Sequence, residues 1–165
     1  MIIGIIWTLI LSIIAGILQS TLIGRIAIFN VVPDLALCIV VFSAYVNGTM
    51  PGQVSGFLSG LFLDFLSAAP LGLNCLVRTL IGALAGVFKG AFFLDMIFLP
   101  VLLCAIATLI KALILLLLNL IFGNSIPAYS FVTSTLWIEL GMNALCAPLL
   151  FLLLRKIKYL VPKRR

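Results

Sequence analysis

The sequence contains no histidine and only four acidic residues among 165. Histidine-dependent catalytic triads, proton relays and metal sites are therefore excluded. A Walker loop, a Gly-x-Ser-x-Gly elbow and a His-Glu-x-x-His motif are also absent, and no pattern pairs a nucleophile with a base. We expect no catalytic residue, no cofactor and no metal. A hydrolase that uses carboxylates alone stays open, although Asp64 and Glu139 fall on separate hairpins.

Cysteine is also scarce. The four cysteines are far apart in the sequence, and each lies inside an apolar run: Cys38, Cys75, Cys104 and Cys146. Disulfides and cysteine metal sites both need cysteines at suitable spacings and in a suitable compartment. The pattern predicts neither of them.

Charged residues make up 8% of the chain and hydrophobic residues 65%, with a mean hydropathy of +1.42. These values lie far outside the range of soluble domains and indicate an integral protein of the lipid bilayer. The formal net charge is +6, but six basic residues of the C-terminal segment 155–165 carry all of it. The other four basic residues balance the four acidic ones, so no basic face is left for nucleic acid.

Apolar runs predict an all-α bundle of six transmembrane helices with short loops, in a single domain over residues 1–165. The expected spans are 2–23, 33–47, 52–68, 75–93, 97–122 and 131–154, followed by the basic tail 155–165. The second is short for a span and needs a thinned bilayer, its flanking residues or burial among neighbours. By the positive-inside rule the tail is cytoplasmic, and an even count places the N-terminus on the same side.

Glycine recurs at every fourth position on two neighbouring helices. The first series is Gly48, Gly52, Gly56, Gly60 and Asp64; after a turn at Pro70 and Gly72, the second is Arg78, Gly82, Gly86 and Gly90. Glycine weakens a helix, so this use of it predicts close packing of the two helices as a hairpin. A strict four-residue spacing drifts by about 40° per step, so we expect part of the first stripe, with Ser55 and Ser59, to remain open for a partner helix.

Four ionisable side chains lie at membrane depth: Asp64, Arg78, Lys111 and Glu139. Each is costly in hydrocarbon and needs a partner in the bundle interior. Their distances from the connecting turns predict an Asp64/Arg78 pair and a Lys111/Glu139 pair. A polar cavity or proton path is one interpretation. We favour the other, in which both pairs fix the register of the helices, because the charges balance and there is no histidine relay.

Three segments carry a resemblance to a known family. They are Val32-Pro33-Asp34-Leu35 at the start of the second helix, Gly56-Phe57-Leu58-Ser59-Gly60-Leu61-Phe62-Leu63-Asp64 in the third, and Pro70-Leu71-Gly72 in the following turn. Together they resemble the MreD family of rod shape-determining membrane proteins, over about residues 32–90. Lys111 and Glu139 match no motif of that family.

The resemblance implies a non-enzymatic scaffold of the bacterial elongation machinery in the cytoplasmic (inner) membrane. Its expected partners are a single-pass MreC-like protein, MreB, a SEDS glycosyltransferase and a penicillin-binding transpeptidase. The family is also similar in fold to the substrate-binding S-components of energy-coupling-factor transporters. A small-molecule-binding transporter subunit is therefore the alternative, and a lipid flippase or channel is a third class.

Overall fold

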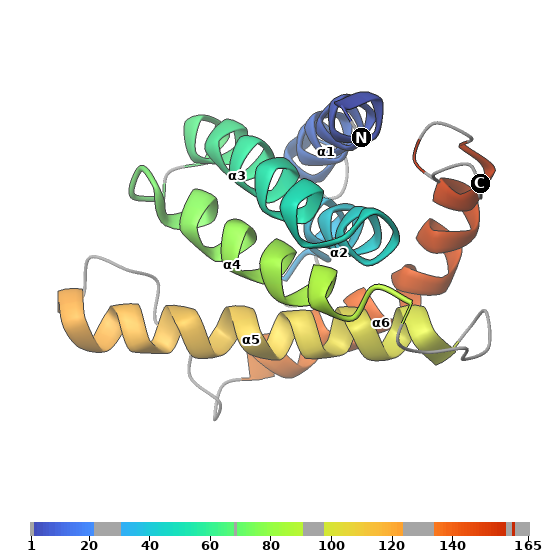
Figure 1. Ribbon diagram of the computed structural model, residues 1–165. Coiled ribbons are helices and arrows are strands. Elements are labelled where there is room, and N and C mark those ends of the chain that lie inside the picture. Colours follow the sequence, from blue (N-terminus) through green and yellow to red (C-terminus); the bar gives the residue numbers. More distant parts are fainter. Residues whose placement is uncertain are drawn as a thin grey trace.

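The computed structural model describes residues 2–21, 31–67, 69–90, 98–123, 134–157 and 160. The helices over these residues are α1 (Ile2–Thr21), α2 (Leu35–Asn47), α3 (Thr49–Leu66), α4 (Leu73–Val87), α5 (Phe98–Phe122) and α6 (Ser134–Lys156). The expected all-α class and the six helices are confirmed. Figure 1 shows α3 and α4 as a hairpin, with the long α5 below them and α6 behind α5.

Two of the differences from the predicted helix limits bear on the glycine stripes. We expected the third helix to begin at residue 52, but α3 already begins at Thr49, and Gly48, at a φ of 103°, makes the turn. Pro51 is tolerated because the amide groups of a first helical turn have no partner within the helix. The fourth helix ends at Val87 rather than at residue 93, and Gly90 lies in the turn that follows. Gly48 and Gly90 are thus outside the two glycine stripes.

Helix α2 lies at the centre of the molecule and packs against every other helix described. All residues from Ala36 to Ala44 are buried. A helix of 13 residues is only about 20 Å long, too short to cross a bilayer unaided. Burial among neighbours, one of the three solutions expected, is the one that the structure shows.

Helices α1 and α2 run in opposite directions. Near the start of α1 the Thr8 hydroxyl contacts that of Ser43 at 2.7 Å, close to the end of α2. Near the end of α1 the Gln19 amide donates to the carbonyl of Pro33, just before α2 begins. The start of α1 and the end of α2 are therefore at the same end of the molecule.

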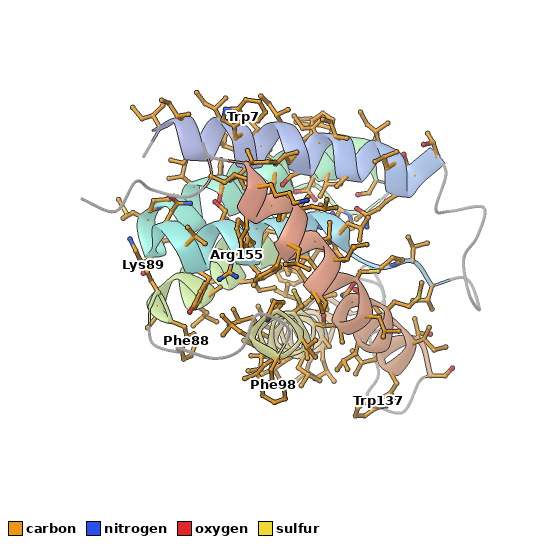
Figure 2. All side chains as sticks on the ribbon, turned by 90° about the vertical axis from the view of Figure 1, so that its right-hand side faces the viewer. Trp7, Phe88, Lys89, Phe98, Trp137 and Arg155 are labelled. Atoms are coloured by element: carbon orange, nitrogen blue, oxygen red, sulfur yellow. The ribbon has the colours of Figure 1, made fainter. Side chains whose placement is uncertain are left out.

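The C-terminal segment reaches that end as well. The Asn47 side-chain amide donates to the carbonyl of Leu160 at 3.0 Å, and Lys89 Nζ donates to the Asn47 carbonyl at 2.9 Å. Figure 2 shows Lys89 and Arg155 toward one end and Trp137 toward the other. The start of α1 and Leu160 thus lie toward one side of the bundle, which is the arrangement that an even number of spans requires.

By length and composition, α1, α5 and α6 could cross a membrane, while α2 and α4 are shorter apolar helices. Helices α1 and α5 run in different directions, since Figure 1 shows α5 lengthwise and Figure 2, turned by 90°, shows α1 lengthwise. They cannot both lie along a membrane normal. The six-span topology with cytoplasmic termini stays a prediction.

The glycine stripes of α3 and α4 face each other, which confirms the predicted close packing. A Cβ atom at Gly56 would overlap the carbonyl of Arg78, and one at Gly60 would lie 2.5 Å from Cα of Cys75. Gly52 and Gly82 meet each other's backbone in the same way, and Gly86 meets Thr49. Only residues without Cβ atoms permit this distance between the two backbones.

Candidate functional site

Asp34 lies at the first turn of α2 and holds two cations. Its Oδ1 accepts the Leu37 amide at 3.0 Å, which caps the helix, and accepts Arg78 Nη2 at 2.6 Å. Its Oδ2 accepts Lys111 Nζ at 3.0 Å. The Val32-Pro33-Asp34 segment was expected only at the start of the second helix, and the ion pairs of Asp34 were not predicted. One carboxylate therefore joins α2 to both α4 and α5.

The chain of charges continues to α6. Lys111 Nζ lies 2.6 Å from Glu139 Oε1, so the predicted Lys111/Glu139 pair is confirmed. We call Asp34, Arg78, Lys111 and Glu139 the ion network; its formal charges cancel. Buried ion pairs contribute little net stability because desolvation offsets their attraction, but they penalise any other register of the helices.

Asn143 supports the ion network and was not among the predicted site residues. Its Oδ1 accepts the Asp34 amide at 2.7 Å, and its Nδ2 donates to Thr108 Oγ1 at 3.0 Å. The sequence held a signal for both residues, because Thr108 and Asn143 lie one helical turn from Lys111 and Glu139. They extend the same helix faces.

A cavity of about 400 Å³ opens beside the ion network, all four members of which line it. The other lining residues come from the last turns of α1 and α3, the segment before α2 and the first turn of α6: Gly16, Gln19, Ser20, Val31, Val32, Leu63, Leu66, Ser67 and Thr135. The cavity is therefore at the end of the molecule opposite Lys89 and Leu160. Its volume is within the range of small-molecule sites.

The family model described as rod shape-determining protein MreD matches residues 1–157. The chain belongs to the MreD family. It is thus a membrane protein with a role in rod shape determination. Comparisons with curated proteins and with solved structures gave no match. The likeness to transporter S-components stays a prediction.

In this MreD-family chain, Asp64 does not pair with Arg78, and that prediction was wrong. The Asp64 carboxylate accepts the amides of Gly72, Asn74 and Cys75 at 2.9–3.1 Å and the Asn74 side-chain amide at 3.0 Å. Matching depths along a hairpin did not decide the pairing, because the backbone amides at the start of α4 have no partner within the helix and donate to the Asp64 carboxylate instead.

The Pro70-Leu71-Gly72 segment completes this cap. The Leu73 amide donates to the carbonyl of Pro70 at 3.1 Å, and Gly72 adopts a φ of 94°, which suits glycine. The two aspartates thus have different roles. Asp34 binds side chains across the bundle, and Asp64 closes the turn between α3 and α4.

We expect Asp64→Ala to lower the free energy of unfolding by about 2–4 kcal/mol, because several buried amides lose a charged acceptor. If Asp64 paired with Arg78, as the sequence predicted, adding Arg78→Met to Asp64→Leu would restore the stability that Asp64→Leu alone loses. The structure predicts that Asp64→Leu with Arg78→Met is less stable than Asp64→Leu alone, because Asp34 then loses a cation. Detergent-induced unfolding of the three purified variants measures this order.

The predicted open stripe on the third helix is not open. Ser55 and Ser59 are 0% and 1% exposed, and Gly52, Gly56 and Gly60 all meet the backbone of α4. From Gly52 to Gly60 the four-residue spacing turns around the helix twice by about 40°, or about 80° in total. Residues within such an arc can all face the same neighbouring helix. The serines face the interior and not a partner, so the expected docking surface was placed wrongly.

Proposed function

We propose that this MreD-family protein is a non-enzymatic scaffold of the bacterial elongation machinery in the cytoplasmic membrane. It links an MreC-like single-pass protein and the peptidoglycan synthases, a SEDS glycosyltransferase and a penicillin-binding transpeptidase, to MreB. Family membership supports the role in rod shape. The scaffold role is supported by the surface that the helices present.

The observation that carries the proposal is the outer face of α3, which we define as Val54, Phe57, Leu61 and Phe65. Their spacing places them on one side of the helix, opposite the glycine stripe. All four are exposed, Phe65 at 74%. The exposed parts of the two aromatic side chains, Phe57 and Phe65, provide apolar area for binding another helix.

An apolar groove of about 230 Å³ lies beside this face, between α1 and α3. Its lining is Leu9, Ile13, Leu58, Leu61, Phe62 and Phe65. None of these side chains is polar, so an occupant must offer apolar side chains alone, as a transmembrane helix does. We assign the groove to the single transmembrane helix of the MreC-like partner.

The test is co-purification of the MreC-like partner with a double variant, Leu61→Ala with Phe65→Ala. We expect at least a tenfold loss of bound partner, which corresponds to about 1.4 kcal/mol. The matched control is Leu117→Ala with Leu120→Ala, which removes the same kind of side chain from the exposed surface of α5. The control should bind as the wild type does.

Equal binding by both double variants would show that lipid covers the groove and that the partner docks elsewhere. Cell shape is measured in the same strains at equal membrane levels of the protein. Loss of rod shape then reports lost assembly and not a lower amount of protein. Co-purification of ATPase subunits in place of the cell-wall proteins would favour the transporter alternative and overturn the scaffold.

A further inference from the structure

The cavity beside the ion network has a mixed lining that the scaffold role does not use. Leu63 and Leu66 of α3 and Val31 before α2 supply apolar walls, while Arg78 and Glu139 lie among the charged lining residues. Small-molecule sites combine mostly apolar walls with a few placed polar groups. Residues from α1, α3, α4, α5 and α6 meet here, so the cavity is a product of the complete fold.

Arg78 provides the second observation. Its side chain is 6% exposed, and Nη2 is bound to Asp34. Its Nη1 is buried and has no hydrogen-bond partner in the described structure. Buried guanidinium nitrogens are almost always hydrogen-bonded, so a donor of this kind beside a cavity requires an acceptor from outside the described residues.

The charge of the site selects the class of ligand. Two cations and two carboxylates line the cavity, and every one of them is already in an ion pair. An added anion or cation would leave a net charge in a buried site. A neutral acceptor, such as an amide or ester carbonyl, binds a guanidinium N–H without changing that balance.

We propose that this cavity binds a small neutral molecule that offers a carbonyl oxygen to Arg78 and an apolar portion to Leu63 and Leu66. The inference goes beyond the scaffold function and does not depend on it. Under the predicted topology the cavity would open on the outer side of the membrane, opposite the basic tail.

Three probes of equal chain length test the ligand class: hexanamide, hexanoate and hexylamine, which are neutral, anionic and cationic at pH 7. Each is titrated against the full chain in detergent, and binding is followed by saturation-transfer NMR. We expect saturable binding of hexanamide and at least about tenfold weaker binding of the two charged probes.

A pair of neighbouring substitutions locates the binding. Thr135 lines the cavity and Ser134 does not, and both are exposed at the start of α6. Thr135→Trp should weaken hexanamide binding at least about tenfold, and Ser134→Trp should leave it unchanged. Circular dichroism confirms that both variants keep their helices.

Three results would overturn the proposal. If all three probes give equal signals and Thr135→Trp does not change them, the probes partition into the detergent and do not bind in the cavity. Tighter binding of hexanoate or hexylamine would mean a site for ions. Lack of saturable binding by hexanamide would mean that the cavity holds water alone.

Discussion

Replacing Asp34 with alanine is expected to lower the free energy of unfolding by about 3–5 kcal/mol. The substitution removes the carboxylate shared by Arg78 and Lys111 and leaves the arginine as an unpaired buried charge. Loss of the helix cap on Leu37 adds about 1 kcal/mol. Detergent-induced unfolding of the purified chain, followed by circular dichroism, measures the change.

Partial rescue distinguishes the ion network from simple packing. Asp34→Asn with Arg78→Met keeps an acceptor for the cap, removes one charge of each sign and leaves the Lys111/Glu139 pair. We expect this double variant to be more stable than Asp34→Ala. Glu139→Ala should cost less than Asp34→Ala, because Lys111 keeps its contact with Asp34 at 3.0 Å. If Asp34→Ala and Glu139→Ala unfold alike, Asp34 is not the central member.

The sequence predicted the parts of the structure that depend on local pattern. Apolar runs located six helices, and the recurring glycines identified the α3–α4 contact. The Lys111/Glu139 pair also followed from sequence, because α5 and α6 are consecutive and depth along a hairpin relates directly to residue number.

The central role of Asp34 could not be predicted in the same way. Its partners are 44 and 77 residues away along the chain, on helices that are not its immediate neighbours in sequence. Only the three-dimensional arrangement brings α2 into contact with both α4 and α5. The cap role of Asp64 was missed for a related reason. The sequence does not show which backbone amides near the turn lack a partner, and those amides donate to Asp64 in the structure.

The interior position of Ser55 and Ser59 shows the limit of a geometric argument from one helix. The drift of a four-residue pattern predicts which residues of a helix turn away from its first neighbour. It does not predict whether other helices cover those residues. Helix α3 packs against α1 and α2 in addition to α4. The exposed side chains of α3 are the large ones on its outer face, and not the small ones.

Adding a leucine side chain to the α3–α4 contact is expected to have the largest effect of all. At Gly56 a Cβ atom would overlap the backbone of Arg78, which cannot rotate away as a side chain could. Gly56→Ala should therefore cost about 1–3 kcal/mol, the usual range for overpacking, and Gly56→Leu should prevent accumulation of folded protein. Unfolding in detergent measures the first, and the amount of folded protein in membranes the second.

Gly141 is the matched control, since it lies within α6 and a Cβ atom there would meet nothing within 4 Å. Alanine favours a helix over glycine by about 0.5–1 kcal/mol, so Gly141→Ala should raise stability. Opposite signs at the two glycines would show that backbone contact, and not helix propensity, sets the requirement at Gly56. A stabilising Gly56→Ala would mean that α3 and α4 are farther apart in the membrane, and that Arg78 reaches Asp34 from a different position.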